Sequence, residues 1–480
     1  MGIKPSAVLC CSPEQHSINL SSSESSIRAY PDDEPLIYST DFDPSHSLQY
    51  DRLQISFKPY TNLINLSKTD IQEYPCLLQL TPPSIPEKQG LDIVYIIEVS
   101  SNMNSWLSPV INCVAYSLKQ LNKSDRVSIV AFNDTAVKLI PLSSVSVQNH
   151  SRIINNLKLI QGAGGCNLNE GLTMGLNILG MRRMCNTISS LIIFSKSEEG
   201  ANRIKEIIQN AGISTNFFIN VFGLGEHSTE VLSNLPNETM GNYYNVPHPS
   251  TLFQAFGSCF GDLSSLYVDG LKVEVELVRS TIPVSLEKCY ECRQCITYGK
   301  PAQMCILMNI MPCSHSFKQN FLLKLLKVNV RYRIVPSGEE VREELFFDIP
   351  LNSHDNRNEK FEVCQETVVE LYRVKFAEVL YEALFEDSDT ASESLQRFLM
   401  EMQRDRKIKD FVCISHIVEE CKNFQQLLNL GWNPALKARI VCSMKGFMDK
   451  SLFYYEDFQN SSQISHQGSL KELSESRKRI

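Results

Sequence analysis

The 480-residue sequence lacks a long apolar run and lacks an excess of positive charge. A membrane-spanning helix needs about 18 to 20 consecutive apolar residues, and no stretch approaches that length without charged side chains. The formal net charge is −8 at pH 7, so a general attraction to nucleic acid is not expected. The N-terminus also lacks the apolar core of a secretory signal. We therefore expect a cytoplasmic protein that binds no nucleic acid.

Sequence signatures of catalysis are missing as well. No serine-hydrolase elbow, zinc-protease motif, phosphate-binding P-loop or dinucleotide-binding motif occurs, and the 9 histidines fall at no recognised triad spacing. Residues 162–165 are rich in glycine, but no Lys-Ser or Lys-Thr pair follows them to bind a phosphate. The 16 cysteines are expected to be reduced thiols, because a chain without a leader meets no oxidising compartment. We predict a protein that is not an enzyme and holds no cofactor.

The periodicity of the apolar residues indicates the fold class. Over residues 90–263, short continuous apolar runs alternate with stretches of helical spacing. This predicts an α/β domain with a doubly wound, mostly parallel, Rossmann-like sheet. Residues 265–365 alternate with a period of two, which predicts an accessory antiparallel β-sandwich. We expect two strands within residues 49–86 to complete that sandwich.

The remaining segments differ in composition. Residues 366–458 return to helical spacing and predict a C-terminal α-helical segment, in which the acidic residues 386–393 are expected to form a loop. Residues 1–48 and 459–480 are rich in serine and weakly apolar. We expect them to be a disordered leader and a disordered tail.

Four stretches of the α/β segment carry the pattern of a known family. They read DIVYIIEVSSNM at residues 92–103, SDRVSIVAFN at 124–133, GGCNLNEG at 164–171 and FGLG at 222–225. In order and spacing they resemble the von Willebrand factor type A domain over residues 90–263. In an open α/β sheet the binding crevice lies at the carboxyl ends of the strands, and three loops of this chain are expected to meet there.

The resemblance implies an ion site in this crevice. In that family the first loop supplies Asp, Ser and Ser, the second Thr and the third Asp; together they hold one Mg²⁺ or similar ion, which a partner's carboxylate completes. The corresponding residues here are Glu98, Ser100, Asn102, Cys166 and Lys196. Four of the five positions differ, and a longer carboxylate, a sulfur and an ammonium suit Mg²⁺ poorly.

We therefore predict a degenerate site without a metal ion. The ammonium of Lys196 is able to pair with Glu98 and to occupy the vacated charge site. Two interpretations stay open. Either the loops form a metal-free polar patch that binds a protein partner, or Glu98 and Lys196 are ordinary solvated loop residues, since surface ion pairs contribute little.

The resemblance extends, with less specific motifs, to intracellular proteins in which a type A domain precedes a β module and helices. These include plant RING-type ubiquitin ligases. A RING requires a rich set of Cys and His ligands, whereas residues 1–48 contain only Cys10, Cys11, His16 and His46. Ligase activity is therefore not carried over from the family.

A second cluster is a candidate for zinc binding. Cys289, Cys292 and Cys295 have the spacing of zinc ligands, and Cys313 and His315 follow them. The alternative is an ordinary strand-and-loop region in a cysteine-rich protein. We favour this alternative, because the second half lacks a paired CxxC or a pair of histidines.

The N-terminus fits the N-myristoylation pattern, which requires Gly2 and a small hydroxyl residue at position 6. Cys10 and Cys11 are candidate palmitate acceptors, and would supply the second anchor that stable attachment to a membrane surface needs. A plain disordered start is the alternative.

From these features we expect a non-catalytic interaction or scaffold protein with a protein partner of unknown identity. A lipid-anchored peripheral membrane protein is one alternative hypothesis. A ubiquitin-ligase relative without an evident RING is the other.

Overall fold

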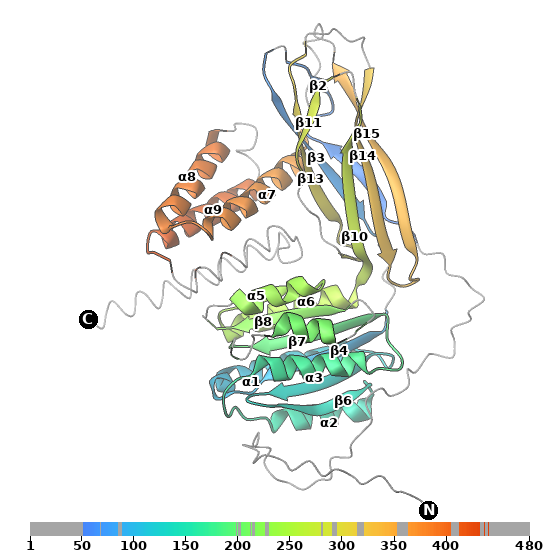
Figure 1. Cartoon of the computed structure of the whole chain (residues 1–480), viewed down its shortest axis with the longest axis vertical. Helices are drawn as coiled ribbons and strands as arrows, with labels where there is room; N and C mark the ends of the chain where they lie inside the picture. The colour runs from blue at the N-terminus through green and yellow to red at the C-terminus, as the bar shows by residue number, and fades with distance from the viewer. Residues whose placement is uncertain are drawn as a thin grey trace, which may run out of the picture.

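The computed structural model shows three parts, an α/β domain, a β-sandwich above it and a helical unit beside the sandwich (Figure 1). The structure describes residues 51–67, 69–84, 89–197, 199, 203–211, 213, 217–225, 230–279, 282, 283–289, 295–313, 321–352, 363–404, 412–432, 436 and 440. Gly2, Cys10 and Cys11 lie outside these residues. Among the described helices, none is both long and apolar enough to span a membrane.

The α/β domain is built on a sheet of 6 strands in the order β6-β5-β4-β7-β8-β9. Neighbouring strands run parallel, apart from the antiparallel pair β5 and β6. The strands are β4 (Leu91–Glu98), β5 (Arg126–Phe132), β6 (Ala136–Ser144), β7 (Ile188–Ser195), β8 (Phe218–Leu224) and β9 (Tyr243–Val246). This is the doubly wound, mostly parallel architecture that the sequence predicts.

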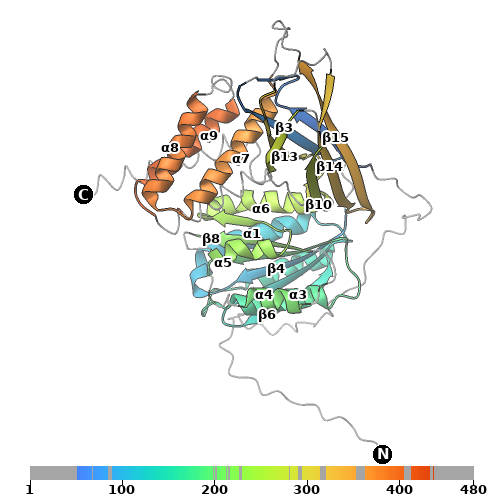
Figure 2. The ribbon, with the colours of Figure 1, turned by 45° about the horizontal axis from the view of Figure 1, so that its top comes forward.

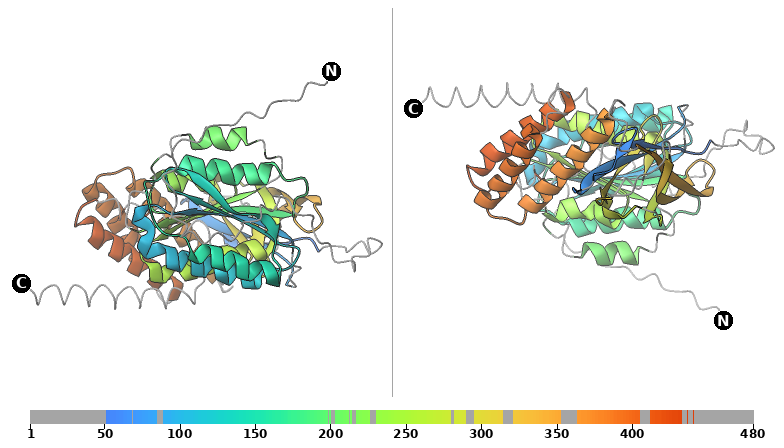
Figure 3. Two further views of the ribbon diagram at one scale, coloured as in Figure 1. Left: turned by 90° about the horizontal axis from the view of Figure 1, so that it is seen from below. Right: turned by 90° about the horizontal axis from the view of Figure 1, so that it is seen from above.

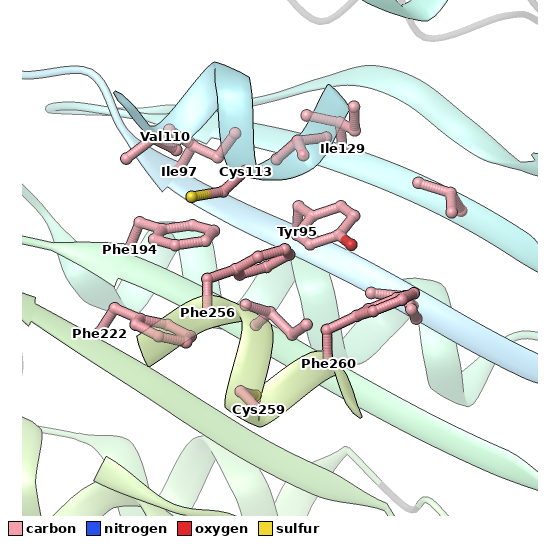
Figure 4. Close-up of a cluster of buried hydrophobic side chains, with 14 of the residues drawn as sticks. Tyr95, Ile97, Val110, Cys113, Ile129, Phe194, Phe222, Phe256, Cys259 and Phe260 are labelled. Atoms are coloured by element: carbon pink, nitrogen blue, oxygen red, sulfur yellow. The ribbon is translucent and has the colours of Figure 1, made fainter. Parts of the chain in front are cut away.

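Helices cover both faces of this sheet (Figure 3). They are α1 (Asn104–Gln120), α2 (Val147–Lys158), α3 (Leu168–Gly180), α4 (Ile204–Asn210), α5 (Glu230–Asn234) and α6 (Pro249–Ser264). On the face of α1, α2 and α6, the ring of Phe194 stacks on Phe222 at 5.0 Å, and both rings lie 6.0 Å from Phe256 (Figure 4). Because both faces are covered, every residue of β4 is buried, and its sequence is a continuous apolar run from Ile93 to Ile97.

The β-sandwich consists of two sheets, with orders β1-β3-β13-β11 and β12-β10-β14-β15-β2. Its strands are β1 (Gln54–Pro59), β2 (Ile64–Asn65), β3 (Gln72–Thr81), β10 (Leu266–Leu277), β11 (Val284–Cys289), β12 (Ile296–Thr297), β13 (Ala302–Ile310), β14 (Phe321–Ile334) and β15 (Glu340–Asn352). Pairing is antiparallel, except that β2 runs parallel to β15. The chain thus begins the sandwich, leaves it for the α/β domain and returns to it.

The helical unit contains α7 (Gln365–Ala383), α8 (Ser388–Arg404) and α9 (Val412–Leu428). Helix α7 lies against the outer face of the first sheet, where Leu371 and Val374 pack on Cys305 and Leu307 of β13. Strand β13 is therefore buried on both faces, which explains why its sequence shows little polar alternation.

The acidic stretch that we expected to be a loop instead begins helix α8. The carboxylate of Asp387 accepts hydrogen bonds from the amides of Asp389 at 3.1 Å and Thr390 at 2.9 Å. An aspartate in this position satisfies amides that have no partner at a helix N-terminus. The expectation of a loop through residue 393 was wrong, because this capping residue starts a helix within the acidic cluster.

Candidate functional site

Three loops meet at the carboxyl edge of the central sheet. Strands β4 and β7 are parallel neighbours, so the loops that follow them lie side by side. The second loop, residues 162–167 before α3, is joined to the first, which follows β4, by main-chain hydrogen bonds. The amide of Ala163 donates to the carbonyl of Val99 at 2.9 Å, and the amide of Ser101 donates to the carbonyl of Gly164 at 3.1 Å.

Glu98, the last residue of β4, is fully buried at the centre of these loops. Its Oε1 accepts a hydrogen bond from the Ser100 hydroxyl at 2.5 Å. Its Oε2 accepts from the Ser195 hydroxyl at 2.7 Å, the Lys196 amide at 2.7 Å and the Ser197 amide at 3.2 Å. Hydrogen bonds to a charged acceptor are among the stronger ones in proteins. The protein itself therefore supplies the partners of this buried carboxylate.

The same arrangement decides whether a cation fits. A cation binds the lone pairs of its ligands, whereas the main-chain amides of Lys196 and Ser197 point hydrogen atoms at Oε2 of Glu98. Mg²⁺ also demands near-octahedral oxygen ligands at about 2.0–2.1 Å. A cation would have to displace donors that already satisfy the carboxylate, so this set of residues does not fit a hard divalent ion.

Cys166, in the loop before α3, belongs to the same cluster. Its thiol is hydrogen-bonded to Glu98 and to the Ser197 side chain. Burial, with a smaller contribution from the negative charge of Glu98, raises the pKa of Cys166 to about 12. At neutral pH this residue is a neutral thiol and not a thiolate ligand.

The raised pKa predicts an unreactive cysteine, because the thiolate is the nucleophile. At pH 7.5, alkylation of Cys166 by iodoacetamide should be roughly a thousandfold slower than that of an ordinary thiol, whose pKa is about 8.5. The rate should rise about tenfold per pH unit toward pH 12. Residue-resolved mass spectrometry of a labelling time course measures it, with the urea-unfolded chain as the control. Equal labelling rates in the folded and unfolded chains would contradict the burial argument.

Two residues expected in this site do not reach the carboxylate with their side chains. Asn102 lies exposed in the short 3-10 turn at Ser101–Met103. Lys196 contributes its main-chain amide, and among the described residues its ammonium forms no ion pair with Glu98. In the described part of the structure the carboxylate of Glu98 is instead satisfied by hydroxyl and amide donors.

Sequence reasoning passed over the two serines that flank Lys196. Ser195 donates its hydroxyl to Glu98, and Ser197 donates its amide. Their signal in the sequence is their position directly at the end of a buried strand, where side chains and amides both face the crevice. The family pattern assigns a ligand position only to Lys196, which lies between these two serines.

A turn after β5 holds the glycine-rich loop in place. The side-chain amide of Asn133 donates to the carbonyl of Ala163 at 2.9 Å, and the carboxylate of Asp134 accepts from the amide of Gly165 at 3.0 Å. Gly164 has a φ of +77°, and a Cβ there would lie 2.5 Å from Asp134 Oδ2. A glycine is therefore required at this point of the loop.

A second buried charge cluster lies at the opposite, amino edge of β4. The carboxylate of Asp92 accepts hydrogen bonds from Arg126 at 2.8 and 2.7 Å and from Arg182 at 2.5 Å. The amide of Asn186 donates to it at 3.0 Å. All three charged side chains are 0–1% exposed. The cluster joins the starts of β4, β5 and β7, far from the crevice loops, and is structural.

The candidate zinc residues are not brought together as a set. Strand β11 pairs with β13 so that Cys289 lies opposite Ile306, whereas Val284 lies opposite Ile310. These ends are four strand residues apart, about 13 Å, and Cys313 lies beyond the second end, where its amide donates to the carbonyl of Ser67. Cys289 and Cys313 therefore cannot ligate one ion. Cys292 and His315 lie outside the described residues, and Cys295 lies 3.9 Å from the sulfur of Met240.

The fold and these loops define the class of the α/β part of the chain. Residues 91–245 match the family model of the von Willebrand factor type A domain, and the chain contains a domain of this class. The structure resembles the ArnB paralog VWA2 from Sulfolobus acidocaldarius, with a TM-score of 0.50 and 16% identity over 84% of this chain and 100% of that chain. It also resembles a von Willebrand factor type A protein from Catenulispora acidiphila, with a TM-score of 0.52 and 11% identity over 80% of this chain and 91% of that one.

A curated relative matches in sequence. E3 ubiquitin-protein ligase WAV3 from Arabidopsis thaliana is 22% identical over 276 residues, which cover 52% of this chain and 34% of that protein. The chain thus spans about a third of the length of the curated relative it matches. Coverage by the two solved structures extends beyond the type A domain, so the likeness in fold includes other parts of the chain.

Proposed function

We propose that this chain is a non-catalytic interaction protein whose type A domain presents a metal-free face to a protein partner. The observation that carries the proposal is the buried carboxylate of Glu98, which is surrounded by hydroxyl and amide donors from two loops. An ion that would attract an acidic group of a partner has no place in this arrangement. The loops keep their shape, and recognition rests on shape and on hydrogen bonds.

The rim of the crevice supports such a role. Ser101, Asn102, Asp134, Gly165 and Glu199 are exposed around the buried carboxylate. They combine hydroxyl, amide, carboxylate and main-chain groups, which both donate and accept hydrogen bonds. Non-obligate protein interfaces commonly have a polar composition of this kind.

The contacts between the β-sandwich and the type A domain support a scaffold role. The ammonium of Lys300, in the sandwich, lies 2.7 Å from the carboxylate of Asp262 in α6. Beside it, the amide of Tyr298 donates to the carbonyl of Ser265 at 2.8 Å. These contacts fix the start of the sandwich against the last helix of the type A domain. A partner bound at the crevice would therefore be held in a defined orientation to the rest of the molecule.

Affinity purification with variants of the rim tests the proposal. The double variant Asn102→Arg, Lys196→Asp changes two side chains of the loops. It keeps the main-chain amide at position 196, which donates a hydrogen bond to Glu98. We expect partners that bind wild type to be lost from this variant. Lys158→Glu, an exposed change in α2, is the matched control and should keep them. An identical set of partners for all three proteins would overturn the proposal.

The relative named as a ubiquitin ligase supports a second candidate function, participation in ubiquitin transfer. The match covers only 34% of that relative, and we infer that this chain binds a protein partner without transferring ubiquitin itself. An assay with purified chain, E1, an E2 panel, ubiquitin and ATP separates the two functions. The proposed interaction role predicts no ubiquitin conjugates above those formed without the chain, whereas conjugates that depend on the chain would establish ligase activity.

A further inference from the structure

The end of helix α7 carries two exposed aromatic side chains. Most of α7 is buried, because the helix packs between the first sheet of the sandwich and helices α8 and α9. Its last turn emerges from this packing. There Tyr381 is 52% exposed, and Phe385, two residues after the helix, is 76% exposed. The two rings contact each other edge-on at 5.1 Å, and we call them the α7 aromatic pair.

The end of helix α9 lies beside the same turn. The three helices of the unit lie side by side (Figure 2). The indole N–H of Trp432 donates a hydrogen bond to the carbonyl of Glu386 at 3.1 Å, and the Ser392 hydroxyl donates to the side chain of Asn429 at 3.2 Å. Leu430, which follows Asn429, is 83% exposed. This end of the unit therefore presents the α7 aromatic pair and an exposed leucine, and grouped apolar side chains on a surface are typical of interaction sites.

The segment that carries the α7 aromatic pair holds negative charge and no positive charge. Residues 378–393 contain six carboxylates and no lysine or arginine. Glu382, Asp389 and Glu393 are exposed, and within the described part of the chain none of the three forms an ion pair. Arg397, the next cation along α8, donates to a serine hydroxyl at 3.0 Å. These three carboxylates are therefore available to a partner.

Exposed rings beside available carboxylates match the chemistry of arginine. A planar guanidinium stacks on the face of an aromatic ring and also pairs with a carboxylate, whereas the ammonium of lysine is a compact and strongly hydrated charge. The exposure of Phe385 leaves its ring accessible to such a group. The same carboxylates repel the phosphates of nucleic acids and of acidic lipids. Charge complementarity therefore favours a basic segment of a protein.

We infer that this end of the helical unit binds a basic, arginine-containing segment of a protein partner. An arginine of the segment stacks on the α7 aromatic pair, and other basic side chains pair with Glu382, Asp389 and Glu393. Apolar side chains of the segment cover Leu430. This surface is separate from the crevice of the type A domain and does not depend on it. Two surfaces allow the chain to hold two proteins at once.

Binding of a labelled peptide to the full chain, followed by fluorescence anisotropy, tests the chemistry. The probe is a short peptide in which arginine alternates with leucine, and its counterpart has lysine in place of each arginine. We expect the arginine peptide to bind about threefold more tightly or better, with an affinity that falls as salt is added. No binding, or equal affinity for the two peptides, would overturn the inference.

Removal of the rings locates the site. The double variant Tyr381→Ala, Phe385→Ala should weaken binding of the arginine peptide about tenfold. The matched control is Tyr116→Ala, Phe253→Ala, which removes a second edge-on pair, 38% and 50% exposed, from the type A domain. Helix α6, which carries Phe253, has Asp262 as its one charged residue. The control should keep wild-type affinity, and equal affinities of the two double variants would reject the site.

Neutralised carboxylates separate a local site from a general attraction. Glu382→Gln combined with Glu393→Gln should weaken binding about fivefold at low salt. Glu274→Gln combined with Glu276→Gln changes the net charge equally at exposed positions of β10 and should leave the affinity nearly unchanged. Equal losses in both variants would show that the peptide responds only to net charge, which would overturn the inference.

Two further measurements exclude other locations and occupants. The crevice variant Asn102→Arg, Lys196→Asp should bind the peptide as wild type does, and a loss of binding there would place the site at the crevice instead. Sedimentation should show the same monomer for wild type and for the double variant Tyr381→Ala, Phe385→Ala. A wild-type dimer that this variant dissolves would assign the surface to a second copy of the chain. Circular dichroism and unfolding midpoints confirm that each variant is folded.

Discussion

An Asp92→Asn variant is expected to lose about 3–5 kcal/mol of the free energy of unfolding, because removing one partner of a buried ion cluster leaves the others uncompensated. Arg126 and Arg182 both direct guanidinium groups at this carboxylate, and each is 1% exposed. Asparagine keeps the shape and one acceptor oxygen but removes the charge. Two buried guanidinium groups would then face a neutral amide.

Urea denaturation followed by circular dichroism measures this loss. Asp348→Asn is the matched control, because Asp348 is exposed on β15 and surface changes usually stay within about 0.5 kcal/mol. A difference below about 1 kcal/mol between the two variants would show that the cluster at the amino edge is far less important than its burial suggests.

The second large effect is expected at the crevice. Glu98→Ala removes the acceptor of the Ser100 and Ser195 hydroxyls and of the Lys196 and Ser197 amides. Each buried donor left without a partner costs about 1–3 kcal/mol. We expect a total loss of about 3–5 kcal/mol of the free energy of unfolding, since the hydroxyls can turn to other acceptors while the two amides cannot.

Glu98→Gln separates the charge of this residue from its shape. Its side-chain oxygen can still accept from the Ser195 hydroxyl and the two amides, and its NH₂ group can donate to Ser100. The expected loss is about 1–2 kcal/mol, because hydrogen bonds to a charged group are stronger than those to a neutral one. Chemical denaturation of the three proteins gives the order wild type, Gln, Ala. A Gln variant as unstable as the Ala variant would contradict the role given to these hydrogen bonds.

The fold class was predictable because the number of buried faces of a strand or helix determines the spacing of its apolar residues. The run from Ile93 to Ile97 is apolar throughout, since helices cover both faces of β4, and β14 alternates because one of its faces meets solvent. Strand β13 was harder to predict. Helix α7 covers its outer face through Leu371 and Val374, and a contact between segments so far apart in sequence leaves no local pattern.

The candidate site was predictable as a location but not as a set of contacts. The positions of Glu98, Ser100 and Cys166 follow from the order of strands and loops, and the structure brings their side chains together. The partners of Glu98 from the third loop include main-chain amides, which every residue carries. No pattern of side chains reveals such amides. The sequence instead predicted that the ammonium of Lys196 would be the partner of Glu98.

Metal content together with a stability titration tests the central claim most directly. A bound ion present at 100 times its Kd would raise the free energy of unfolding by about 2.7 kcal/mol. We predict that the purified chain carries no stoichiometric Mg²⁺ or Mn²⁺, and that its unfolding midpoint stays constant as either ion is added. One ion per chain, with stabilisation that Glu98→Ala abolishes, would contradict the account of a carboxylate satisfied by the protein alone.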